Sequence, residues 1–136
     1  MSDLYLSYTE YRDGGEVREG DEDEAFPNYE DTHIDWYLTK CLKSKRDKPW
    51  PAEIVSVGFD PTVGDDVHVV YVRYTTGCTF GTTYGAWHIV GVYQNIEDAE
   101  AIRKSIDNET YEGYRPWVGY FESIESCGVQ TMKVQP

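Results

Sequence analysis

Two runs of β-branched and aromatic residues that lie close together in the chain constrain the fold most strongly. Val67–Thr75 and Trp87–Tyr93 carry such residues at nearly every position, which favours strands covered on both faces. The segment between them, Thr76–Ala86, is rich in threonine and glycine and is too short for a parallel crossover helix. The two runs therefore predict an antiparallel pair at the centre of a sheet, joined by an irregular hairpin loop.

One helix and several further strands are expected around this pair. Asn95 is a candidate N-cap, and Ala99, Ile102 and Ile106 recur at helical spacing, so a helix is predicted from there to about Asn108. Strand composition is found in the segments Leu4–Tyr8, His33–Leu38, Glu53–Phe59, Trp117–Ser123 and Val129–Val134. The predicted fold class is α+β: a single domain with a mainly antiparallel β-sheet and one helix packed on one face.

Charge divides the chain into two regions. Residues 1–48 form an acidic N-terminal region, and residues 52–136 form the predicted hairpin, helix and strand core. Twelve acidic residues lie between Met1 and Asp35, against only Arg12 and Arg18. The densest run, Glu19–Glu24, predicts an exposed loop over Tyr11–Glu24, because blocks of like charge repel one another. The net charge of −13 argues against direct binding to nucleic acid or to an anionic membrane, and favours a partner with a basic surface.

The sequence carries no sign of export or of a structural metal. It has no apolar run long enough to cross a membrane and no signal-peptide pattern, so a cytoplasmic protein is expected. Its three cysteines, Cys41, Cys78 and Cys127, are odd in number and far apart, which favours reduced thiols over disulfides or a zinc site. No cofactor is predicted, and the oligomeric state is left open.

The threonine- and glycine-rich segment is the candidate ligand site. Backbone amides freed by glycine, together with threonine hydroxyls, bind anions, and an aromatic ring nearby stacks on a base. The residues concerned are Thr76, Gly77, Thr79, Gly81, Thr82, Thr83, Tyr84 and Trp87. No lysine follows as in a P-loop, so a plain hairpin loop is the favoured interpretation. Cys78 with His68 or His88 is the candidate nucleophile and base pair. Histidines this scattered meet such a pattern by chance, so a non-enzyme is favoured.

The acidic run and the surplus of aromatic residues are the candidate protein-binding features. Carboxylates on a surface can imitate a phosphate backbone and occupy a basic groove, although a solvated face that keeps the protein soluble is the simpler interpretation. The aromatic residues are too many for one small core, so some are expected at the surface as interface anchors. The predicted protein-binding residues are Glu19, Asp21, Glu22, Asp23, Glu24, Trp36, Tyr111 and Tyr114.

The region Val67–Ser123 resembles a family of small proteins of unknown function found in tailed bacteriophages and some bacteria. The matching segments are Val69–Tyr74, Thr79–Gly81, Ile89–Tyr93, Glu97–Glu100 and Trp117–Ser123. The resemblance covers less than half of the chain and implies no reaction. It implies a phage accessory protein acting in the host cytoplasm, a class in which small acidic members often resemble inhibitors of host defence or nucleic-acid enzymes.

Together these features predict a non-enzymatic accessory protein that binds and blocks a host defence or nucleic-acid-processing protein through its acidic face and exposed aromatic residues. Two alternatives stay open. One is a protein that sequesters a nucleotide signal with Thr75–Gly85, and the other is a virion structural or assembly component.

Overall fold

The computed structural model describes residues 2–14, 32–44, 52–78, 81–119 and 122–136. The elements are β1 (Ser2–Gly14), β2 (Thr32–Leu42), β3 (Ala52–Val57), β4 (Asp66–Cys78), β5 (Gly81–Tyr93), α1 (Ile96–Asp107) and β6 (Ser123–Gln135). The acidic run 19–24 lies outside the described residues, so the prediction of an exposed loop there remains a prediction.

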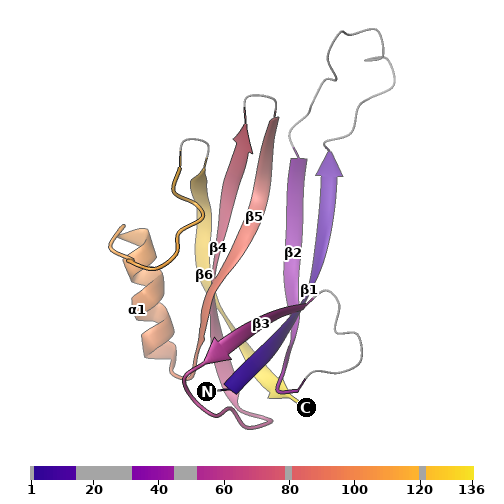
Figure 1. Cartoon of the computed structure of the whole chain (residues 1–136), viewed down its shortest axis with the longest axis vertical. Coiled ribbons are helices and arrows are strands. Elements are labelled where there is room, and N and C mark those ends of the chain that lie inside the picture. The colour runs from indigo at the N-terminus through magenta and orange to yellow at the C-terminus, as the bar shows by residue number, and fades with distance from the viewer. Residues whose placement is uncertain (1, 15–31, 45–51, 79–80, 120–121) are drawn as a thin grey trace, which may run out of the picture.

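Within the described part, six strands form one sheet in the order β3-β1-β2-β5-β4-β6 (Figure 1). The β1–β2, β1–β3, β4–β5 and β4–β6 pairs are antiparallel, in agreement with the expected mainly antiparallel sheet. The parallel pairing was not expected. β2 runs parallel to β5 at one end and to β6 at the other, through the pairs Thr32–Thr83, His33–Tyr84, Cys41–Val134 and Leu42–Gln135. Strand β2 therefore joins the N-terminal strands to both edges of the β5-β4-β6 unit.

The central antiparallel pair is confirmed, but the predicted loop within it is wrong. β4 continues to Cys78 and β5 begins at Gly81, with Thr76 opposite Thr83 and Gly77 opposite Thr82. Threonine is β-branched and suits a pleated strand. The pairing between the two strands continues through Gly77, which lies opposite Thr82, and Gly81, which lies opposite Cys78. The connection between the two strands is accordingly much shorter than the sequence indicated.

Two other boundaries also differ from the prediction. β1 extends past Tyr8 to Gly14 and so includes the start of the expected acidic loop. The predicted strand Trp117–Ser123 is wrong, because residues 117–119 and 122 lie in turns and irregular backbone, and the strand begins only at Ser123. β6 then runs through Gly128, where the absence of a side chain leaves room for the ring of Tyr71.

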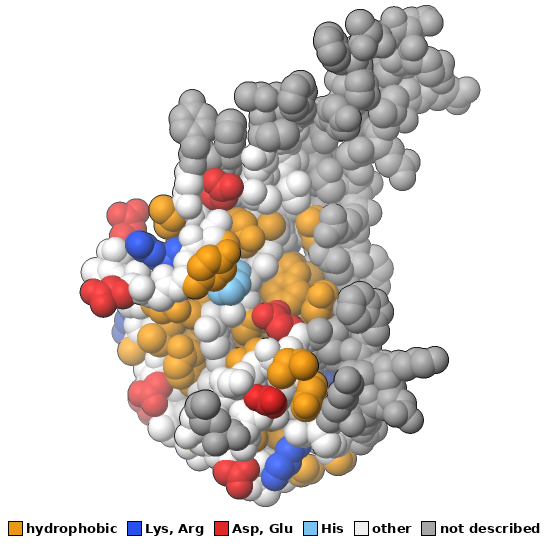
Figure 2. All heavy atoms as spheres, in the orientation of Figure 1, with side chains coloured by type: hydrophobic (Ala, Val, Ile, Leu, Met, Phe, Trp, Pro, Cys, Tyr) orange, Lys and Arg blue, Asp and Glu red, His pale blue; other side chains and the backbone are white. Residues whose placement is uncertain are grey.

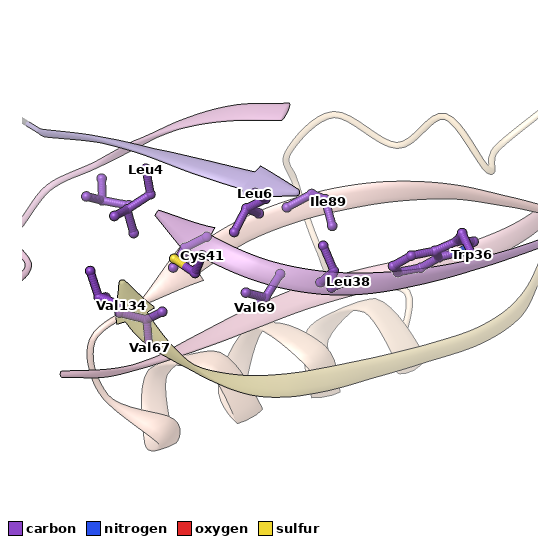
Figure 3. Packing of buried hydrophobic residues seen from close by; sticks show 11 residues of the cluster. Leu4, Leu6, Trp36, Leu38, Cys41, Val67, Val69, Ile89 and Val134 are labelled. Atoms are coloured by element: carbon purple, nitrogen blue, oxygen red, sulfur yellow. The ribbon is translucent and has the colours of Figure 1, made fainter. Parts of the chain in front are cut away.

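The sheet is covered on both faces in its centre. On one face, β4 and β5 pack against the N-terminal strands, and Leu6, Val69 and Ile89 converge from β1, β4 and β5 (Figure 3). On the other face, Val70 and Val72 of β4 pack against α1 and Trp117 in a second core. The alternation along β4 confirms the prediction of a strand buried on both sides. The first core draws residues from both the 1–48 and the 52–136 regions.

Candidate functional site

A half-open groove lies between the C-terminal end of α1, the segment 109–119 and the start of β6. Its volume is about 550 Å³. Apolar and aromatic side chains form its walls, and charged side chains stand among them: the lining comprises Ile106, Glu109, Tyr111, Arg115, Trp117, Val118, Gly119, Glu122, Ser123 and Ile124. Mixed apolar and charged linings of this kind suit a binding surface.

The end of α1 positions the segment that forms this groove. The chain leaves the helix through Glu109, whose φ of 61° lies in the left-handed region. The amides of Thr110 and Tyr111 both donate to the carbonyl oxygen of Ser105, at 2.8 and 3.1 Å. These bonds satisfy a helix-terminal carbonyl and turn the chain from the helix toward the start of β6 (Figure 1).

Aromatic rings anchor the segment against the sheet. Trp117 is only 6% exposed and belongs to the core beneath α1. Tyr111 stacks on it with ring centroids 6.2 Å apart, and His88 of β5 lies 6.3 Å from the Trp117 ring. Tyr114 meets His88 edge to face at 5.3 Å. The segment is therefore held by ring contacts that leave part of its surface outside.

Three apolar side chains in this part of the chain are exposed. Tyr114 is 73% exposed, Val118 is 61% exposed and Ile124 is 38% exposed. Figure 2 shows hydrophobic side chains gathered around a histidine on this face, with acidic side chains set among them. We name the residues Tyr114, Val118 and Ile124 the apolar rim. Exposed aromatic and branched side chains next to a groove mark sites of protein contact more often than plain solvent-facing positions do.

Acidic groups define the electrostatics of the groove. Among the described residues that line it, Glu109 and Glu122 are acidic and Arg115 is the one cation. Glu122 also accepts a hydrogen bond from the hydroxyl of Thr76 at 3.4 Å. We name Glu109 and Glu122 the acidic corner of the groove. Burial raises the pKa of Tyr74, and the neighbouring Tyr114 and Glu122 raise it further, so the Tyr74 phenol lies near Glu122 of this corner. A cationic group of a partner would be favoured there.

The pH dependence of stability is one expected consequence of this packing. Burial lowers the pKa of His88 below its usual value of 6.5, so the unfolded chain takes up the proton at a higher pH than the folded chain. Stability is therefore expected to fall as the pH drops through about 6.5 and toward the folded pKa. The replacement His88→Gln should reduce this dependence in urea unfolding measured between about pH 7.5 and 5.5. Equal pH slopes for the wild type and the variant would contradict it.

The predicted aromatic anchors fall in different places. Tyr111 lines the groove, and Tyr114 contacts His88 and directly precedes the lining residue Arg115. Trp36 does not lie at the groove, because it is 6% exposed and lies in the first core, where its ring stacks on Trp87 at 4.3 Å. Trp36 is therefore no exposed anchor, and this part of the interface prediction is corrected. The predicted acidic contact residues 19–24 lie outside the described residues.

The structure does not bring the predicted anion-binding residues into a loop. Thr76, Gly77, Thr82 and Thr83 are paired across β4 and β5, and Gly81 faces Cys78. Gly85, at the end of this segment, has a positive φ of 78°, whereas Gly77 lies within β4 opposite Thr82. The ring of Trp87 is engaged by Trp36, and Tyr84 is 39% exposed. Thr79 lies outside the described residues.

The two cysteines whose side chains are described, Cys41 and Cys127, are free thiols. Burial raises the pKa of Cys41 to about 11, and burial and nearby Asp107 raise that of Cys127 to about 11, so both thiols stay protonated at neutral pH. The side chain of Cys78 lies outside the description. No group of metal-ligating residues was found among the described side chains. In the same part of the chain, no helix has the length and apolar character to cross a membrane.

Sequence reasoning missed the part of the site contributed by Arg115, Val118, Glu122 and Ile124. Expecting a strand over Trp117–Ser123 hid the fact that these residues border a groove. The signal was present in Arg115-Pro116 and in Gly119, since proline and glycine interrupt regular structure. Comparison with models of protein families, with curated proteins and with solved structures found no match.

Proposed function

We propose that this chain is a non-enzymatic binding protein whose groove beside α1 receives a segment of a partner protein. The observation that carries the proposal is the apolar rim, where Tyr114 is 73% and Val118 is 61% exposed beside a groove of about 550 Å³. Burying a tyrosine and two aliphatic side chains at an interface gains apolar contact area from groups that the fold already holds in place.

Preorganisation supports this use of the rim. Tyr114 rests on His88, and Tyr111 rests on the buried Trp117, so ring contacts fix the surface before a partner arrives. A surface that is already ordered loses less conformational entropy on binding. Tyrosine and tryptophan held in this way are the residue types that dominate binding energy at protein interfaces.

Charge indicates the kind of partner. Glu109 and Glu122 line the groove against a single Arg115, and the whole chain carries a net charge of −13. Such a field repels nucleic acid and attracts cationic protein surfaces over about a Debye length. The partner segment is accordingly one with an apolar anchor for the rim and a lysine or arginine for the acidic corner.

The wider role follows from the resemblance to phage proteins and is also a proposal. An acidic accessory protein that covers a basic surface on a host defence or nucleic-acid-processing protein would block access to that surface. Residues 19–24 would add to the attraction. Reversing the charges of Glu19, Asp21, Glu22 and Asp23 tests this contribution separately from the groove, because it leaves the apolar rim intact.

The groove is tested by capture of partners from a bacterial lysate with three proteins. These are the wild type, a rim variant carrying Tyr114→Ala and Val118→Ala, and a control variant carrying Ile54→Ala and Val63→Ala. Ile54 and Val63 are 60% and 47% exposed but lie outside the groove, so the control removes similar apolar surface elsewhere. The rim variant is expected to lose the partner and the control variant to keep it.

Two outcomes would count against the proposal. Partner capture that is equal for the rim variant and the wild type would remove the groove from the interaction. Recovery of a nucleotide in place of any protein would favour the sequestering alternative. Unfolding curves of all three proteins establish that the variants are folded, since exposed substitutions should change stability by only about 0.5 kcal/mol.

A further inference from the structure

Strand β6 is paired with β4 along one side, and its other side is largely open. The β4–β6 ladder begins at Ser123 and continues to Lys133. On the other side of β6, the described strands provide a partner only at Val134 and Gln135, where β2 runs beside it. Before that point β6 is the outermost strand of the sheet (Figure 1).

The direction of the unpaired backbone groups follows from the ladder. The amide of Val134 donates to the carbonyl oxygen of Asp65, and its carbonyl oxygen accepts from the amide of Gly64, both at 2.8 Å. Val134 therefore points its backbone groups toward the β4 side. These groups alternate in direction along an antiparallel strand, so those of Cys127 and Val129 point away from β4. Among the described groups, no hydrogen bond to the backbone of either residue is found on that side.

This edge has few of the features that protect an outer strand. Prolines and charged side chains discourage another strand from pairing with an exposed edge. The sequence from Ser126 to Met132 contains neither, and Thr131 within it is exposed. One bulge lies before this stretch, at Glu125, and the ladder is regular from Ser126 onward. The edge is therefore able to accept a further strand.

The open edge continues directly into the groove beside α1. Ser123 and Ile124, the first residues of β6, line that groove together with the acidic corner. Glu125 follows them and adds a carboxylate, which accepts a hydrogen bond from the amide of Gly85 at 2.5 Å. Acidic charge at this end favours a cationic segment and disfavours a second copy of a chain whose net charge is −13.

We infer that the partner segment received by the groove binds as an extended strand along β6, with its backbone paired to Cys127 and Val129. Its apolar and cationic side chains at the end nearest Ile124 then meet the apolar rim and the acidic corner. This inference rests on the proposed function and adds to it the conformation of the partner segment. Strand addition takes its affinity from main-chain hydrogen bonds and its specificity from alternate side chains, whereas a helical segment would leave the edge of β6 unpaired.

The experiment titrates the full chain with an alternating lysine–valine hexapeptide whose ends are acetylated and amidated. Amide hydrogen exchange is followed by NMR in the free protein and with peptide at about ten times its dissociation constant. In the free protein, the amides of Cys127 and Val129 should exchange rapidly, and the peptide should slow them by about tenfold. The amides of Gly128 and Gln130 point toward β4 and should be protected to the same extent with and without peptide.

N-methylated peptides test the backbone pairing itself. One analogue is methylated on its valine nitrogens and the other on its lysine nitrogens, so each loses the N–H groups along one edge of the extended peptide. Pairing with β6 uses one edge of the peptide. One analogue should therefore bind about tenfold or more weakly, and the other about as well as the parent peptide. Equal affinities of the two analogues would overturn the inference.

The rim variant carrying Tyr114→Ala and Val118→Ala separates this inference from the proposed function. If the peptide binds the wild type but not the rim variant, and exchange at Cys127 and Val129 stays rapid, the groove binds without strand pairing and the inference fails. If the peptide protects both amides equally in the two proteins, strand pairing is supported and the role of the apolar rim fails. A wild type that does not bind the peptide overturns the inference. Protection of the two amides that rises with protein concentration alone also overturns it, because a second copy then occupies the edge.

Discussion

Replacing Gly85 with alanine is expected to lower the free energy of unfolding by about 3 kcal/mol. Gly85 has a φ of 78°, a conformation that costs a residue with a side chain. In addition, a Cβ at this position would overlap the carbonyl oxygen of Ile34 on the neighbouring strand β2. Either Gly85 must leave its conformation or β2 must move away from β5, and both changes weaken the pairing between these two strands. Urea unfolding followed by tryptophan fluorescence measures the loss.

Gly64→Ala separates the two causes. Gly64 has a φ of 97°, but a Cβ there would meet nothing within 4 Å. This variant should therefore lose only the conformational part, about 1 kcal/mol. If Gly64→Ala and Gly85→Ala destabilise the protein equally, the close approach of Gly85 to Ile34 is not a constraint on the fold.

Leu6→Ala is expected to destabilise the protein by a similar amount, about 3 kcal/mol. Leu6 is fully buried at the centre of the first core, where Val69 and Ile89 approach it from β4 and β5 (Figure 3). Truncation removes buried apolar surface and leaves a cavity that rigid strands cannot fully close. The free energy of unfolding from urea denaturation is the measured quantity.

Ile54→Ala is the matched control for Leu6→Ala. Ile54 lies on β3, next to β1, and is 60% exposed. Its truncation should change stability by no more than about 0.5 kcal/mol. A small effect of Leu6→Ala, close to that of Ile54→Ala, would mean that β1 does not pack against β4 and β5 in solution.

The central hairpin and the helix could be predicted because their signals are local. Val67–Thr75 is apolar on both faces, and the structure places Val69 in one core and Val70 in the other. The helix follows from Ala99, Ile102 and Ile106 at helical spacing, and Ala99 and Ile106 are its buried residues. Hydrophobic periodicity reports directly which residues are covered, so these elements needed no knowledge of their partners.

The parallel contacts of β2 could not be predicted in this way. They depend on pairing between Thr32 and Thr83 and between Cys41 and Val134, which are far apart in the chain. No local pattern reports which strand edges meet. The predicted loop over Thr76–Ala86 is wrong for a related reason. A segment rich in glycine and threonine favours a turn locally, but pairing between β4 and β5 extends both strands through it.

The candidate site was predicted only in part. An excess of aromatic residues correctly implied that some are exposed, and Tyr114 is, but composition alone could not separate it from the buried Trp36. Burial of a given ring depends on which strands cover it. The groove itself arises because the chain turns back at Glu109 and leaves Val118 outside, a three-dimensional arrangement with little local signal.

Partner binding at the groove beside α1 can be measured as the affinity of the captured partner for three purified proteins. Calorimetric titration would compare the wild type, the Tyr114→Ala and Val118→Ala rim variant, and the Ile54→Ala and Val63→Ala control. The rim variant is expected to bind about thirtyfold more weakly, corresponding to about 2 kcal/mol for the loss of a central aromatic anchor, and the control is expected to bind like the wild type. Equal affinity of all three proteins would contradict the assignment of the groove beside α1 as the binding site.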